Sequence, residues 1–130
     1  MIQEYIVSKE EIRSLNEVYG GSLRMDTSIE GVRRRLPAFE IETALSLGKG
    51  KGIYRKVAYL WKAILVGHPF TDGNKRTALM VAVAMLEKCG IKLDGEKKEN
   101  IVSEIRKIAS ENITDINTIE RSIRYAVTGA

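Results

Sequence analysis

A polar loop between two apolar helices constrains the fold of this chain more than any other part of its sequence. The segment from Gly67 to Arg76 holds a histidine, an aspartate, an amide and two cations within ten residues. The nearly continuous apolar run from Ala78 to Leu86 follows it, which is typical of a buried helix. The segment before it repeats apolar residues at helical spacing, namely Val57, Leu60, Trp61, Ile64 and Leu65. The pattern predicts helices over 53–66 and 75–89, with a functional loop between them.

The start of the second predicted helix favours an anion. Asn74 is a good N-cap residue, which would place Lys75 and Arg76 at the first two helical positions. A cation there opposes the helix dipole at a cost of roughly 0.3–1 kcal/mol at an exposed site, so two of them indicate an anionic ligand. Gly73 permits close approach of the backbone. These residues together predict a phosphate site.

Three side chains of the loop add chemistry to that site. Asp72 lies directly before the phosphate site, and Mg²⁺ usually takes one or two carboxylates together with phosphate oxygens and water. His68 is the only histidine of the chain and a natural general base for a hydroxyl nucleophile. Phe70 is expected to anchor the loop to the core. The set predicts phosphoryl or nucleotidyl transfer.

The segment His68 to Arg76 resembles the signature of the Fic/Doc superfamily, His-x-Phe-x-Asp/Glu-Gly/Ala-Asn-Gly/Lys-Arg. Fic members typically carry glycine after the asparagine and a second arginine three positions past the first. This chain has Lys75 and Leu79 at those positions. The run from Asn74 to Leu79 instead resembles the Doc (death-on-curing) branch.

The resemblance implies a toxin-like kinase. Doc enzymes transfer the γ-phosphate of ATP to a threonine of elongation factor Tu, whereas Fic enzymes transfer AMP to target hydroxyls. By position, His68 would be the base, Asp72 the Mg²⁺ ligand and residues 73–76 the phosphate cradle. The resemblance also implies ATP and Mg²⁺ as cofactors and an antitoxin protein as an inhibitory partner.

Composition sets the remaining bounds. A length of 130 residues predicts one domain over residues 1–130, and 44% hydrophobic with 29% charged residues is ordinary globular composition. A single cysteine, Cys89, favours a reducing compartment, and with no secretory signal visible we expect a cytoplasmic protein. No apolar run is long enough to span a bilayer. A net charge of +4 favours anionic ligands, but it is too small to indicate nucleic acid as a partner.

The rest of the chain also predicts helices, so the expected fold is one compact all-α domain of six or seven helices. A capping box from Ser8 to Glu11 starts the first helix, and Asn117 is expected to cap the last. Other helices are expected over 28–36, over 38–47 and from about residue 96 onward.

Other interpretations of the loop remain open. Taken singly, His68 could be a surface residue at a helix end, residues 72–74 a capped turn, and the two cations a solvated surface. A second enzymatic interpretation is AMP transfer to a protein hydroxyl. A third is a non-catalytic module that binds nucleotide or nucleic acid, for which the run Arg33 to Arg35 and the basic charge are the motivation.

Overall fold

The computed structural model describes residues 7–19, 41–67 and 73–130, and this part of the chain is helical apart from short connections and contains no strand. The predicted all-α class is confirmed. The predicted helix over 28–36 lies outside the described residues. The helical segments are α1 (Lys9–Tyr19), a stretch over residues 41–47, α3 (Ile53–Trp61), the π-helical η1 (Lys62–Val66), α4 (Asn74–Lys88), α5 (Gly95–Glu111) and α6 (Ile116–Thr128).

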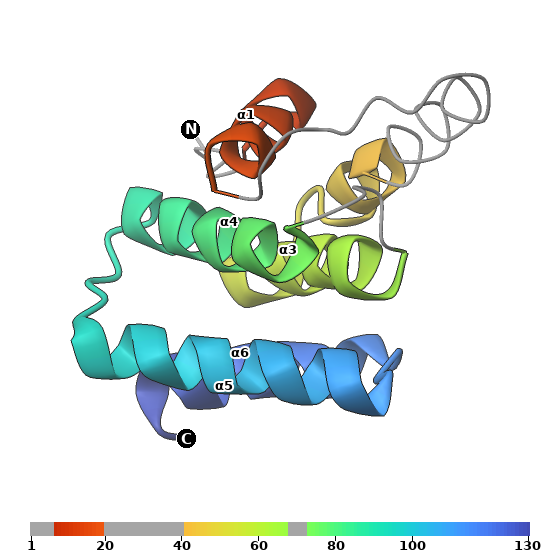
Figure 1. The fold of residues 1–130 in the computed structure, drawn as a ribbon. Helices are drawn as coiled ribbons and strands as arrows, with labels where there is room; N and C mark the ends of the chain where they lie inside the picture. Colours follow the sequence, from red (N-terminus) through yellow and green to blue (C-terminus); the bar gives the residue numbers. More distant parts are fainter. Residues whose placement is uncertain (1–6, 20–40, 68–72) are drawn as a thin grey trace.

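These helices pack in three layers (Figure 1). The middle layer is α4 with α3 and η1 beside it. Helix α1 packs on α4 from one side, and the antiparallel pair α5 and α6 covers the middle layer from the other. Because α4 contacts α1, α3, η1 and α5, it must be apolar on most of its faces, as its sequence predicts.

The core lies on both sides of the middle layer and takes large side chains from α1, α3, η1, α4, α5 and α6. Every member of the apolar stripe predicted before the loop is buried. The largest fully buried side chains include Ile12, Leu60, Trp61, Ile64, Met85, Leu86, Ile101, Ile105, Ile108, Ile119 and Ile123. Burial of so many aliphatic side chains is the main stabilising contribution to this fold.

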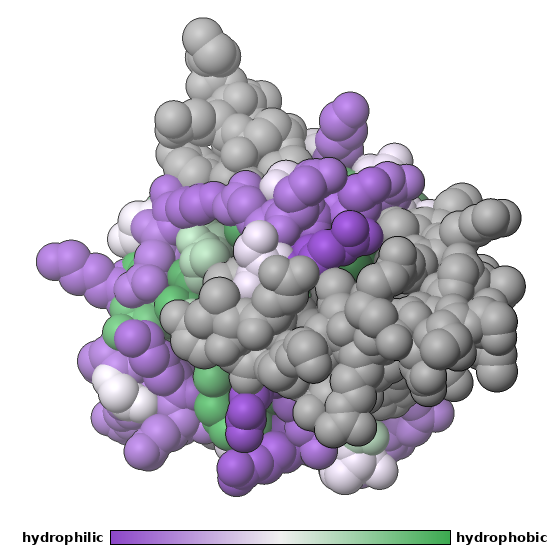
Figure 2. All heavy atoms as spheres, turned by 45° about the horizontal axis from the view of Figure 1, so that its top comes forward, coloured by the Kyte–Doolittle hydropathy of each residue, from purple (hydrophilic) through white to green (hydrophobic). Residues whose placement is uncertain are grey.

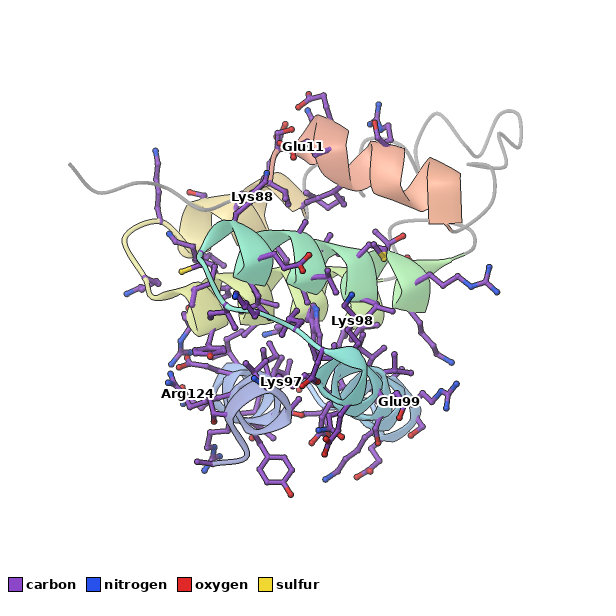
Figure 3. All side chains as sticks on the ribbon, turned by 90° about the vertical axis from the view of Figure 1, so that its left-hand side faces the viewer. Glu11, Lys88, Lys97, Lys98, Glu99 and Arg124 are labelled. Atoms are coloured by element: carbon purple, nitrogen blue, oxygen red, sulfur yellow. The ribbon has the colours of Figure 1, made fainter. Side chains whose placement is uncertain are left out.

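The first helix begins with the predicted capping box. The Glu11 N–H donates to Ser8 Oγ at 3.1 Å, and the Ser8 N–H donates to Glu11 Oε1 at 3.2 Å. Glu11 also forms an ion pair with Lys88 at 3.1 Å, and Figure 3 shows the two side chains pointing toward each other from α1 and α4. The capping box therefore fixes where α1 begins, and the ion pair links this first turn to the end of α4.

The predicted start of the last helix is wrong by two residues. The N-cap of α6 is Asp115, whose carboxylate accepts the Thr118 N–H at 2.8 Å, and whose backbone is extended with φ −71° and ψ 120°. Asn117 already lies inside the helix, and its Oδ1 accepts from Arg55 Nη2 at 2.7 Å. Both residue types can cap a helix, and the extended backbone at Asp115 decides which one does.

The surface agrees with an ordinary globular domain. The described residues that are visible in Figure 2 are mostly hydrophilic, with a limited apolar area between them. Among the described residues, the large exposed hydrophobic side chains are Leu47 and Tyr125. None of the helices described is both long enough and apolar enough to cross a bilayer.

Candidate active site

The described structure ends at Gly67 on one side of the predicted site and resumes at Gly73 on the other. His68, Phe70 and Asp72 lie outside the described residues, so their predicted roles remain predictions. Gly73, Asn74, Lys75 and Arg76 are described and occupy the start of α4, the central helix. The described part of the site is therefore its predicted phosphate cradle.

The first turn of α4 is built on Gly73. This residue has φ +75° and ψ 19°, the left-handed conformation that glycine adopts without steric cost, and it is the N-cap of the helix. The prediction that Asn74 is the N-cap is therefore wrong, because Asn74 is already the first helical residue. Lys75 and Arg76 move to the second and third helical positions, still within the first turn.

Thr77 holds this turn closed. Its backbone N–H donates to the Gly73 carbonyl at 2.9 Å and its hydroxyl donates to the same carbonyl at 2.8 Å. The Thr77 side chain is fully buried, whereas Lys75 and Arg76 are exposed. The turn therefore faces the core through Thr77 and presents its two cations to solvent.

The electrostatics of this helix end favour an anion. The first turn of α4 contains no acidic residue and carries two cations, the reverse of what the helix dipole favours. The first backbone hydrogen bond of α4 runs from the Thr77 N–H to the Gly73 carbonyl. In any helix, the N–H groups of the residues before the first such donor point out of the N-terminal end. These backbone groups and the two cations fit the phosphate groups of a nucleotide.

A magnesium ion needs carboxylate oxygen, and the described residues of this turn supply none. Asp72, which precedes Gly73 in the sequence, is the carboxylate that could hold it. Elsewhere in the described part of the chain, no cluster of three or more His, Cys, Asp or Glu side chains could hold a metal ion. The residues present thus fit a nucleotide phosphate, with one adjacent candidate ligand for Mg²⁺.

The other side of the loop follows an irregular helix end. The chain was predicted to be helical over 53–66; it is α-helical to Trp61 and then π-helical through Val66. The Gly67 N–H accordingly bonds to the Lys62 carbonyl five residues back, at 3.4 Å. The π-helix is rare and often occurs as a single turn near functional sites.

Two contributions to the site were missed from the sequence. The Thr77 hydroxyl could have been anticipated, since threonine within a helix commonly bonds the carbonyl four residues back. The second is the indole N–H of Trp61, which donates to the Ala78 carbonyl of α4 at 2.9 Å. Trp61 was predicted as a core residue and is fully buried, but no sequence pattern indicates which carbonyl its N–H would reach.

The described helices form an all-α domain, and the predicted phosphate cradle lies at the start of its central helix. The model of the Fic/DOC family matches residues 7–86, more than half of the chain, and the protein belongs to this family. The match runs from the start of α1 almost to the end of α4, so it includes the whole predicted site. No curated protein and no solved structure matches the chain. Enzymes of the Fic/DOC family generally transfer phosphate or nucleotide groups to proteins.

Proposed function

We propose that this protein is a Doc-type protein kinase, which transfers the γ-phosphate of ATP to a serine or threonine hydroxyl of a translation factor, with elongation factor Tu as the first candidate. The observation that carries the proposal is the first turn of α4, where left-handed Gly73 is followed by two exposed cations in a position that favours bound phosphate. Membership of the Fic/DOC family makes group transfer to a protein the relevant chemistry. The proposed partners are the translation factor and an antitoxin.

The proposed reaction assigns one task to each residue. His68 accepts the proton of the acceptor hydroxyl while the hydroxyl oxygen bonds to the γ-phosphorus. The bond between that phosphorus and the bridging oxygen of the β-phosphate breaks, and ADP leaves. Residues 73–76 bind and orient the phosphates, and Phe70 anchors the loop. Asp72 would hold Mg²⁺, which neutralises phosphate charge when bound.

Two positions favour phosphate transfer over AMP transfer. Lys75 stands where AMP-transferring relatives typically have glycine, and it adds bulk and charge beside the inner phosphates. Leu79 stands where they typically have a second arginine, and its partly buried side chain packs against the core. An aliphatic side chain offers no donor to a phosphate, so this chain is expected to bind the nucleotide differently.

The test uses ATP labelled at either the γ- or the α-phosphate, with the purified protein, Mg²⁺ and a translation-competent lysate. We expect a lysate protein to gain label from the γ-position only, and His68→Ala to abolish it. Lys98→Ala, which changes an exposed cation on α5, is the control and should transfer normally. Label from the α-position would assign AMP transfer instead. Absence of both labels, with purified elongation factor Tu also unlabelled, would contradict the proposal.

A further inference from the structure

A directional hydrogen bond joins the two largely apolar helices α3 and α4 of the middle layer. The packed side chains of these helices are mainly aliphatic, and hydrophobic and dispersion contacts between aliphatic groups are non-directional. The hydrogen bond from Trp61 Nε1 to the Ala78 carbonyl is different, because a donor–acceptor distance of 2.9 Å lengthens beyond bonding range with a shift of about 1 Å. This bond therefore fixes the register of α4 along α3.

The two partners of this bond lie next to the two ends of the predicted active-site loop. Ala78 is three residues after Lys75, which is about 4.5 Å along the helix axis. Trp61 is the last residue of α3, and only the π-turn η1 separates it from Gly67. The bond that closes this turn is long, at 3.4 Å, and Trp61 lies directly before the turn.

The bond is not needed to satisfy the Ala78 carbonyl. That oxygen is also in the hydrogen-bond ladder of α4, where the N–H of residue 82 is its regular partner. Loss of the indole donor would therefore leave no buried acceptor without a bond, and the expected cost in stability is modest. The effect of losing this donor on the register of α4 along α3 should consequently be separable from its effect on the stability of the fold.

We propose that Trp61 is a positioning residue, whose indole N–H sets the register of α4 against the end of α3 and thereby the separation between the phosphate-binding turn and the chain that enters the loop at Gly67. The inference rests on the proposed function, because it concerns the geometry of the same reaction. Group transfer is sensitive to displacements of about 1 Å between reacting groups. Phosphate binding, by contrast, uses residues 73–76 of a single turn, which move together.

The chain offers a clean test because Trp61 is its only tryptophan. Biosynthetic replacement of tryptophan by β-(3-benzothienyl)alanine therefore changes this position alone and substitutes sulfur for the N–H with little change in shape. Replacement by 5-fluorotryptophan is the matched control, because it perturbs the ring but keeps the donor. For each protein we measure ATP turnover with the acceptor protein that gains label from ATP, and we measure amide hydrogen exchange.

With the benzothienyl analogue we expect kcat to fall about tenfold or more while the KM for ATP stays within about twofold. Amides of Thr77 and Ala78 should exchange about tenfold faster, with those of Ile119 and Ile123 unchanged. The protein with 5-fluorotryptophan should match the unsubstituted protein both in its kinetic constants and in its amide exchange rates. An unchanged kcat, or exchange that accelerates equally throughout the core, would overturn the inference. The latter would mean that the bond serves only global stability.

The two proposals fail differently. If the unsubstituted protein transfers neither label, the proposed function is contradicted. The predicted fall in kcat with the benzothienyl analogue then fails as well. The register role is then decided by exchange alone: acceleration confined to the start of α4 supports it, and any other pattern overturns it.

Discussion

At the scale of single residues, the start of α4 depends on a glycine and a threonine. Gly73 supplies a left-handed backbone that other residues adopt only under strain, and its carbonyl accepts both the N–H and the hydroxyl of Thr77. The buried hydroxyl thus fixes the turn that carries Lys75 and Arg76.

Replacing the Thr77 hydroxyl should therefore cost stability. Thr77→Val keeps the branched shape and removes one partly buried hydrogen bond, for an expected loss of about 1 kcal/mol in the free energy of unfolding by urea. Thr128→Val is the control, because the Thr128 hydroxyl also donates to the carbonyl four residues back, at 2.8 Å, but in an exposed last turn, where it also accepts the Ala130 N–H at 3.2 Å. Equal costs for the two variants would contradict the role assigned to Thr77.

A second prediction at this scale concerns pH. The Ser8 N–H, followed by the Lys88 ammonium, holds the pKa of Glu11 below its ordinary value of 4.5. A lowered pKa means that the folded state favours the carboxylate, so this contribution to stability is fully present above pH 4.5 and is lost as the pH falls through the lowered pKa. Both contacts are on the surface, so the effect should be small and reduced by salt.

We expect Glu11→Gln to be less stable than the unmodified protein at pH 7, and the difference to vanish at acid pH, where both side chains are uncharged. Urea unfolding across this range measures it. Glu99→Gln removes an exposed carboxylate of α5 and serves as the control (Figure 3). A difference that persists unchanged into acid would show that the charge of Glu11 contributes nothing.

At the scale of helices, α6 is joined to α3 by a cluster of charged and aromatic side chains. Glu120 forms an ion pair with Arg55 Nε, although not in hydrogen-bond geometry, and its other oxygen lies 3.2 Å from Arg124 Nη2. The Arg124 guanidinium stacks over Tyr54 at 4.6 Å from the ring centroid. Glu120 therefore connects two arginines across the α3–α6 interface.

Removing the shared carboxylate should cost more than removing one of its partners. Glu120→Ala leaves the partly buried Arg55 without its ion pair, and we expect a loss of about 1–2 kcal/mol, between the values for surface and buried pairs. Arg124→Ala removes the more exposed arginine and should cost less than about 1 kcal/mol. Thermal or urea unfolding compares them, and the reverse order would be inconsistent with a cluster centred on Glu120.

The helices and the start of α1 were predictable from the sequence, whereas the starts of α4 and α6 and the π-turn were not. The stripe from Val57 to Leu65 and the apolar run of α4 follow from the need to bury one face or most faces of a helix. The helix starts at Gly73 and Asp115 depend on which of two nearby residues that can act as an N-cap adopts the non-helical backbone. The residue types do not reveal this. The π-turn was missed because its residues also fit α-helical spacing.

For the candidate site, too, the sequence predicts the position of residues 73–76 in the fold but not all of the contacts that hold them. The residue types in the loop indicate phosphate chemistry, and residues 73–76 do form the exposed start of the central helix. Of the two contacts that hold this turn in place, the bond of the Thr77 hydroxyl to the carbonyl four residues back follows a common helical pattern, whereas the bond of the Trp61 N–H to the Ala78 carbonyl has no sequence signal. The register of one helix along another depends on contacts between residues far apart in the sequence, which a local pattern does not reveal.

At the scale of the molecule, the layers have different roles. Helices α1 and α3 and all but the end of α4 lie within the residues matched by the family, whereas α5 and α6 lie beyond them and cover the other side of α3 and α4. We interpret the pair α5 and α6 as a scaffold that completes the core. The account as a whole then depends on whether the start of α4 binds phosphate.

The most direct test is the melting temperature with and without a non-hydrolysable ATP analogue and, separately, inorganic phosphate. A ligand that binds only the folded state adds about 2.7 kcal/mol at one hundred times its Kd, so we expect a rise of several degrees. The rise should be lost in the double variant Lys75→Ala/Arg76→Ala. It should persist in Lys97→Ala/Lys98→Ala, which removes an adjacent pair of lysines from the start of α5 (Figure 3). An equal rise in all three proteins, or no rise in the unmodified one, would contradict a phosphate site at the start of α4.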